Sequence, residues 1–230
     1  FCRESLLWSK LQHKHVLPFI GVSKDVFSRG MICMILPLME AGNIRRRIST
    51  TDPGKQLTST TFEAHVALGL AYLHDHGVVH GDLHGGNILI DADDHALLTD
   101  FGFSVIAEAT AGAYGSKHGG AAQHFMAPEL WDPDEFGLTH ARYTPATDAY
   151  GFGCTCIELY TGKMPFAGPK MTAFKISMKV LDGKRPPRPS TPFDTPMSDR
   201  MWAVVEASWA QQPGERLKAA DIAKSMEAFV

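Results

Sequence analysis

Three side chains with oxygen ligands lie close together in the middle of the 230-residue chain, within an otherwise apolar and glycine-rich stretch. Asp82 and Asn87 are five positions apart in "HGDLHGGN", and Asp100 follows thirteen positions after Asn87. The segment "NILIDADDHALLTD" has two apolar runs around a polar turn, which predicts a hairpin. Because a hairpin folds back on itself, Asn87 and Asp100 can lie side by side, with Asp82 near both.

Carboxylate and amide oxygens brought together are ligands that Mg²⁺ prefers, and Mg²⁺ normally brings the phosphates of a nucleotide with it. Asn87 and Asp100 are therefore candidate metal ligands, and Asp82 is a candidate for orienting a hydroxyl nucleophile. The alternative at this point is that all three are polar turn residues that cap the ends of strands.

The elements that would position these residues are a few strands followed mostly by helices. The spacing of apolar residues predicts a helix over 3–12, strands over 14–22 and 30–39, a helix from about Ile44, and an amphipathic helix over 59–77. Short strands are expected at "VVH", "NILID" and "ALLTDFG", and a long loop at 107–123. Further helices are expected over 148–161, 170–182, 198–210 and 219–229.

Composition is that of an ordinary globular protein, with 44% hydrophobic and 20% charged residues. A net charge of -3 gives no reason to expect nucleic acid or an anionic membrane as the main partner. The longest apolar run, 31–39, is far short of the roughly 20 residues that span a bilayer. The four cysteines include no C-x-x-C pair, which favours reduced thiols in a cytoplasmic protein. The basic cluster 45–47 is interpreted as the solvated start of a helix, with a docking patch as the alternative.

Five motifs in one order resemble those of eukaryotic protein kinases: "HGDLHGGN" (80–87), "DFG" (100–102), "APE" (127–129), "DAYGFG" (148–153) and "PGERLKAADI" (213–222). The segment "WSKLQHKHVLPFIGV" is similar in sequence to the corresponding segment of tyrosine-kinase-like serine/threonine kinases of fungal type. This resemblance implies an α+β, protein-kinase-like fold. Residues 1–40 would be a partial N-lobe, with the regulatory helix and two or more strands, and 41–230 a complete, mainly α-helical C-lobe.

The resemblance also implies roles for individual residues, with ATP and Mg²⁺ as cofactors and a protein Ser or Thr hydroxyl as the acceptor. The catalytic positions are Asp82 as base, His84 as support, and Asn87 and Asp100 on the metal. The positions implied against the nucleotide are Leu36 as gatekeeper, Pro37, Met39, Leu89 and Asp100. The positions with structural roles are Glu4, Trp8, Phe19, His80, Phe101, Gly102, Glu129, Asp148 and Arg216, of which Arg216 is expected to pair with Glu129.

Three departures from the family pattern stand out. The glycine-rich phosphate loop and the lysine of the third strand would precede Phe1, so the chain is expected to be cut upstream and to transfer phosphate poorly. Gly81 stands where the family usually has an Arg before the catalytic Asp. His84 stands where serine/threonine kinases have a Lys, and it is either a supporting residue or a decayed position.

Two alternatives follow from these departures. The first is a pseudokinase that keeps the fold as a scaffold. The second is a small-molecule phosphotransferase, since "HGDLHGGN" also resembles the loop of aminoglycoside and choline phosphotransferases. Glu129 and Arg216 favour the protein-kinase type, because the small-molecule enzymes lack this pair. Zinc is not expected at the nearby histidines, because no three of them are predicted to lie close enough together to share an ion.

Overall fold

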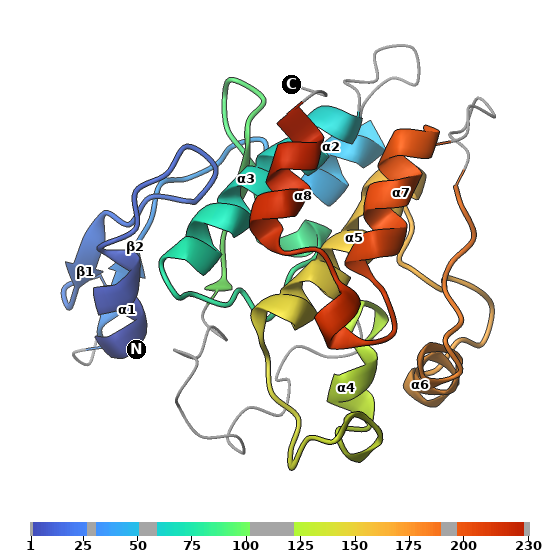
Figure 1. Cartoon of the computed structure of the whole chain (residues 1–230). Coiled ribbons are helices and arrows are strands. Elements are labelled where there is room, and N and C mark those ends of the chain that lie inside the picture. The colour runs from blue at the N-terminus through green and yellow to red at the C-terminus, as the bar shows by residue number, and fades with distance from the viewer. Residues whose placement is uncertain (1, 27–30, 51–58, 102–121, 190–196, 228–230) are drawn as a thin grey trace.

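The computed structural model describes residues 2–26, 31–50, 59–101, 122–189 and 197–227, without the side chains of 2–4, 50 and 59. The N-terminal part holds α1 (Cys2–Trp8) and an antiparallel pair formed by β1 (Gly21–Ser23) and β2 (Cys33–Ile35), with Val22 opposite Met34. Figure 1 shows these elements on one side of the molecule and the helices on the other.

The strands predicted over 14–22 and 30–39 are much shorter in the structure. Pro18 has no N–H to donate, which breaks the pairing of the first strand. Before it, the Leu17 N–H donates to the carbonyl oxygen of Leu98 over 2.9 Å, and the Leu17 carbonyl accepts from Trp8 Nε1 over 2.6 Å. The backbone of this segment is thus tied to a later strand and to a tryptophan, so it does not extend β1.

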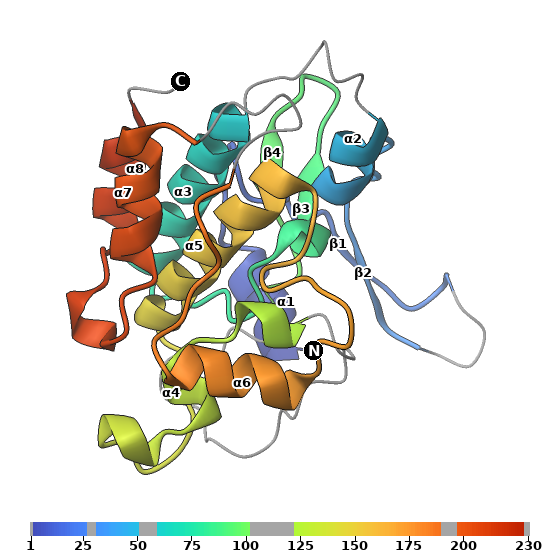
Figure 2. The ribbon, with the colours of Figure 1, turned by 90° about the vertical axis from the view of Figure 1, so that its right-hand side faces the viewer.

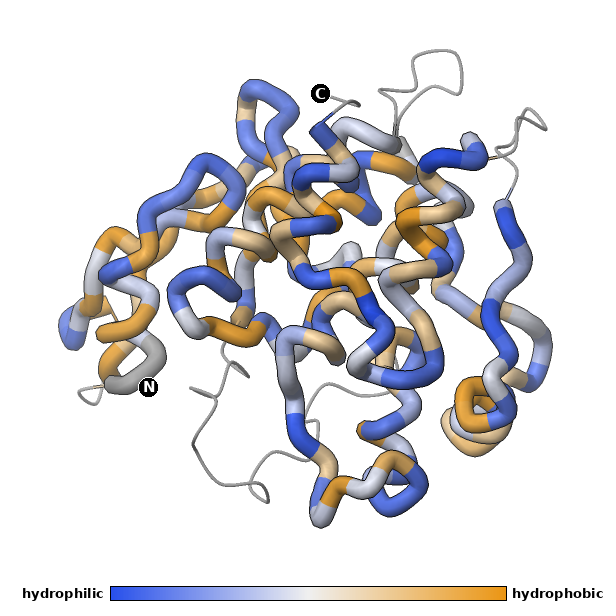
Figure 3. Tube along the Cα trace, in the orientation of Figure 1, coloured by the Kyte–Doolittle hydropathy of each residue, from blue (hydrophilic) through white to orange (hydrophobic). Residues whose placement is uncertain are grey.

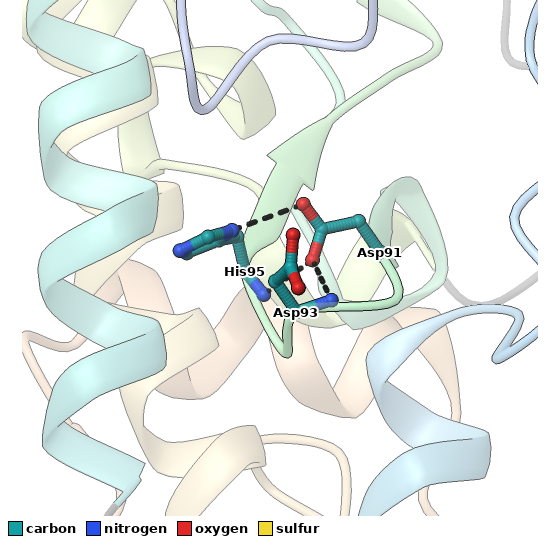
Figure 4. A group of neighbouring side chains, drawn as sticks. All are labelled: Asp91, Asp93 and His95. Carbon is teal, nitrogen blue, oxygen red and sulfur yellow. Dashed lines mark hydrogen bonds and ion pairs between the residues drawn. The ribbon is translucent and has the colours of Figure 1, made fainter.

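The predicted hairpin is present as β3 (Ile88–Ile90) and β4 (Ala96–Leu98), with Leu89 opposite Leu97. Its turn is closed by Asp91, as Figure 4 shows. One oxygen of Asp91 accepts from the N–H groups of Asp93 and His95, and the other lies 3.0 Å from His95 Nδ1.

One other strand prediction was wrong, and another strand is shorter than predicted. Val78–His80 is not a strand, because the His80 N–H donates to a side chain, Asp148 Oδ2, and the Val78 N–H to the carbonyl of Leu73. The last strand ends at Leu98, because Asp100 has a left-handed backbone with φ of 59°.

All the predicted helices that fall on described residues are found, with ends that differ by a few positions. They are α1, α2 (Ile44–Thr50), α3 (Ser59–Asp75), α5 (Pro145–Thr161), α6 (Ala173–Leu181), α7 (Asp199–Ser208) and α8 (Ala219–Met226). The structure adds α4 (Pro128–Trp131), which was not predicted. Helix α5 begins before Asp148 because Thr144 and Thr147 form a reciprocal capping box around Pro145. Of the loop predicted over 107–123, only 122 and 123 are described, at the start of a 3₁₀ turn over Ala122–Phe125.

The core is built around α3 and α5, which Figure 2 shows between α7 and α8 on one side and the β3–β4 hairpin on the other. Helix α3 was predicted to be amphipathic, but it is buried on most sides because α5, α8 and β4 all pack on it. Gly69 permits the segment around His15 to approach α3 closely, because a Cβ at this position would lie 2.5 Å from the carbonyl oxygen of His15. In Figure 3 the apolar residues gather along these central helices. No helix in the described part of the chain is long and apolar enough to cross a membrane.

Candidate active site

The loop that carries the candidate catalytic residues is fixed to the core by Asp148, whose side chain is 2% exposed in the first turn of α5. Its carboxylate accepts from the N–H groups of His80 (2.7 Å) and Gly81 (2.8 Å), and His74 Nε2 lies 2.8 Å away. Gly81 has φ of 77°, a conformation that glycine adopts without the strain other residues would suffer. The glycine that replaces the family's arginine is therefore suited to this backbone.

Asp82 and Asn87 are brought into direct contact across the loop. Asn87 Nδ2 donates to the Asp82 carbonyl over 2.9 Å and to Asp82 Oδ2 over 3.1 Å. The amide orientation leaves Asn87 Oδ1 without a hydrogen-bond donor among the described residues. A neutral oxygen ligand is thereby left available next to an oriented carboxylate.

Asp100 is placed beside Asn87 by the hairpin register. The Thr99 N–H donates to the carbonyl oxygen of Asn87 over 3.0 Å, and Asp100 is the next residue, with an exposed side chain. The backbones of Asn87 and Asp100 are therefore neighbours, whereas the side-chain contact of Asn87 is with Asp82. An exposed carboxylate and an amide oxygen at this point are hard oxygen donors that fit Mg²⁺.

His84 is buried beside Asp82, in surroundings that favour the neutral imidazole. Burial lowers its pKa, the nearby Arg45 lowers it further, and Asp82 opposes the shift. His84 Nδ1 also accepts from the Gly86 N–H over 3.0 Å, which requires that this nitrogen carry no proton. The proton is therefore on Nε2, which lies 3.6 Å from Asp82 Oδ1.

Sequence reasoning missed an ion pair that supports the same loop. Arg45 Nε lies 2.5 Å from Glu158 Oε1, and Glu158 Oε2 accepts from the Gly85 N–H over 2.8 Å. Residues 45–47 do lie at the start of a helix, α2, as expected, but Arg45 and Arg47 are only partly exposed and form ion pairs, Arg47 with Asp94. The only signal in the sequence was a glutamate within an apolar helix, which does not reveal its partner.

Four aromatic residues that the resemblance singled out form a continuous series of tilted or edge-on ring contacts. Ring centroids are 6.4 Å apart between Phe19 and Trp8, 4.4 Å between Trp8 and Phe101, and 6.1 Å between Phe101 and His80. The series of contacts ends at His80, whose N–H donates to Asp148, so it links the N-terminal part to α5.

Two other residues with implied structural roles are not fully described by the structure. The Glu4 side chain and all of Gly102 lie outside the described residues, although the backbone of Glu4 belongs to α1.

Glu129 and Arg216 form a buried, bidentate ion pair 87 positions apart in sequence. Arg216 Nη1 lies 2.6 Å from Oε1 and Nη2 2.7 Å from Oε2, and both side chains are almost fully buried. Arg216 Nη1 also donates to the carbonyl of Ala146 in α5, so the pair joins α4 to the start of the central helix.

The residues implied against the nucleotide lie on two neighbouring segments. Leu36, Pro37 and Met39 follow β2 and are partly buried, and Leu89 is partly buried in β3. The Asn43 backbone forms a bridge with Leu89, which places the segment after β2 next to the hairpin.

Comparison with known proteins establishes the family. Residues 1–226 match the family described as protein tyrosine and serine/threonine kinase, so the chain belongs to it and is a protein kinase domain. The α+β fold with few strands and mainly helical content agrees with that membership, as the motifs implied.

Three relatives show the range of similarity. The chain is 27% identical over its whole length to the serine/threonine/tyrosine-protein kinase HT1 of Arabidopsis thaliana, of which it covers 54%. It is 30% identical over 96% of its length to the putative serine/threonine-protein kinase/receptor R818 of Acanthamoeba polyphaga mimivirus, covering 12% of that protein. It is 28% identical over 93% of its length to the receptor-interacting serine/threonine-protein kinase 2 of Bos taurus, covering 40%. The chain thus spans about half or less of these relatives.

Proposed function

We propose that this kinase domain transfers the γ-phosphoryl group of ATP to Ser or Thr hydroxyls of a protein substrate. The observation that carries the proposal is how the three oxygen-bearing residues lie relative to one another. Asn87 Nδ2 donates to the Asp82 carboxylate, and the hairpin register brings Asp100 beside Asn87. Because phosphoryl transfer depends mostly on positioning and charge neutralisation, a rigid set of such oxygens is what the reaction needs. The named serine/threonine kinases among the relatives support this acceptor class.

Each residue then has a defined task. Asp82 orients the acceptor hydroxyl and takes its proton on Oδ1, because Oδ2 is held by the Asn87 amide. Asn87 Oδ1 and the Asp100 carboxylate would hold Mg²⁺, which when bound neutralises charge on the phosphates. Leu36, Pro37 and Met39 would line the adenine from one side and Leu89 from the other.

His84 is proposed to be a positioning residue. A neutral imidazole does not supply the positive charge of the lysine it replaces. It instead accepts the Gly86 N–H, which holds the loop in shape, and its Nε2 lies 3.6 Å from Asp82 Oδ1. The Arg45–Glu158 pair, in which the glutamate is buried, supports the same loop through Gly85.

The test is phosphotransfer from radiolabelled ATP to myelin basic protein, with Mg²⁺-ATP binding followed separately by thermal shift. Asp82→Asn is expected to lower the transfer rate by at least about 100-fold and to leave Mg²⁺-ATP binding intact, because a general base contributes about that much. Asp134→Asn, at an exposed aspartate, is the matched control. Equal rates for Asp82→Asn and the unaltered chain would contradict the assignment.

We expect a low absolute rate from the 230 residues, in which no G-x-G-x-x-G run occurs. The same assay on a longer product of the gene, if it adds that run and a strand-borne lysine, should be much faster. A scaffold role is the second candidate, favoured by the neutral His84 and by Gly81. Mg²⁺-ATP binding without transfer in the longer product would establish it.

A further inference from the structure

Helix α6 exposes two large apolar side chains that the proposed kinase reaction does not use. Phe174 is 72% exposed and Met178, one turn further on, is 49% exposed. On the opposite face of the same helix Ile176 and Val180 are buried, so α6 is anchored to the domain independently of the exposed pair. Figure 2 shows α6 at the edge of the molecule, beside α4 and away from β1 and β2.

The segment that carries this apolar pair is rich in basic residues. Residues 163–185 contain six Lys or Arg and one Asp, whereas the whole chain has a net charge of -3. Lys175 and Lys179 occupy the helix stripe next to Phe174 and Met178, and Lys170 is exposed just before the helix. None of these three lysines forms an ion pair with a described residue, and Lys175 Nζ only donates to the carbonyl of Lys170.

We propose that this surface of α6 (Phe174, Met178, Lys175, Lys179 and Lys170) binds an acidic segment of a partner protein that carries apolar anchor side chains. The two exposed apolar side chains would enter the contact and lose water, which is the main source of affinity at such sites. The unpaired lysines would select acidic flanking residues and speed up association. Charge complementarity therefore defines the chemistry of the occupant.

A protein segment fits this surface better than an anionic membrane. Outside residues 163–185 the chain has 16 Lys or Arg and 24 Asp or Glu. This net negative charge over the rest of the chain disfavours the approach of the domain to a flat anionic bilayer, because unscreened repulsion acts over about 8–10 Å at physiological ionic strength. An extended or helical peptide is narrow enough to contact the basic surface alone.

The test uses the complete 230-residue chain and three sets of fluorescein-labelled 12-residue peptides, read by fluorescence anisotropy. One set combines Glu with Leu or Phe at i and i+4, a second replaces the apolar residues by Ser, and a third replaces Glu by Lys. We expect binding of the first set only, weakened by raising the salt concentration from 50 to about 500 mM. Phe174→Ser/Met178→Ser and Lys175→Glu/Lys179→Glu should each weaken it by at least about tenfold.

Three controls make the result specific. Leu38→Ser, at a side chain that is 86% exposed, matches the loss of an apolar group, and Lys224→Glu on α8 matches the charge reversal. Asp82→Asn should bind the peptides like the unaltered chain, which separates this surface from the proposed catalysis. Thermal melts check that the α6 variants fold, and the single variants Phe174→Ser and Lys175→Glu replace any double variant that does not.

Several outcomes would overturn the proposal. One is no preference for the acidic, apolar peptides over the other two sets. Another is a loss of binding in the two control variants as large as in the α6 variants. A third is the absence of peptide binding together with co-sedimentation of the chain with phosphatidylserine vesicles. If the α6 variants abolish this co-sedimentation, the occupant of the surface is a membrane.

Discussion

At the scale of single residues, Glu63 is the least expected group in the molecule. It lies on α3, is fully buried, and neither carboxylate oxygen has a hydrogen-bond partner among the residues that the structure describes. Burial raises its pKa from 4.5 to about 8, so the side chain is protonated in the folded protein at neutral pH. A buried neutral carboxyl group is tolerated where a buried, unpaired carboxylate would cost far more.

The raised pKa of Glu63 predicts a pH-dependent stability. Below pH 4.5 the group is neutral in the folded and unfolded states; as pH rises to about 8 only the unfolded state ionises, and stability is lost. Glu63→Gln should remove this loss, so its stability relative to the unaltered chain should grow by up to about 1.4 kcal/mol per pH unit in that window. Urea unfolding from pH 5 to 8 measures it, and parallel curves for the two proteins would contradict it.

At the scale of elements, three histidines join the loop after α1, helix α3 and the β3–β4 turn. The rings of His15 and His65 are stacked with centroids 4.2 Å apart, and His95 lies 5.5 Å from His65. His15 Nδ1 and His65 Nδ1 bond the Ala96 carbonyl and N–H, so these imidazoles hold β4. Burial and then the neighbouring histidines lower the pKa of both His15 and His65 to about 4.

This stack predicts sensitivity to acid. The folded pKa of His15 and His65 is below the unfolded value of 6.5, so their stabilising effect is complete above pH 6.5 and is lost as pH falls towards 4. Lys14 adds to the effect, and Asp91 opposes it at His65. His15→Asn/His65→Asn keeps groups able to bond Ala96 but cannot titrate, so its stability should fall less between pH 6.5 and 4.5. His140→Asn, at an exposed histidine, is the control, and an unchanged slope in the double variant would refute the prediction.

At the scale of the whole molecule, burial is distributed unevenly along the chain. No described residue between 18 and 43 is buried, whereas α5 is buried from Thr147 to Leu159 and α3 along most of its length. Because local opening costs little where few apolar contacts are lost, β1 and β2 should open much more often than the helical core.

Hydrogen exchange followed by mass spectrometry measures this difference. We expect amides of β1 and β2 to exchange at least about 100-fold faster than those of α3 and α5 at pH 7. Trp8 and Leu17, which are buried against the hairpin and the central helices, should mark the boundary of slow exchange. Equal protection of β2 and α5 would show that the N-terminal part opens only with the whole domain.

Much of the fold and of the candidate site was predictable because its signals are local. Helix α5 is indicated by local signals: a capping threonine, a proline at its first position and a glycine, Gly162, after its end. The β3–β4 hairpin follows from two apolar runs around a polar turn, and it is this hairpin that brings Asn87 and Asp100 together. The spacing of Asp82, Asn87 and Asp100 was therefore enough to predict that these three residues lie near one another.

What the sequence by itself determined is the kinase family, the helices and the identity of the residues in the loop, since periodicity, capping and motif spacing depend on neighbours in the chain. The tertiary structure alone decided the protonation of His84 and Glu63, the pairing of Arg45 with Glu158, and the shortness of β1 and β2. Those properties depend on which distant groups exclude water from a side chain or accept a backbone hydrogen bond. A pattern along one chain does not carry that information, because solvation is set by segments far apart in sequence.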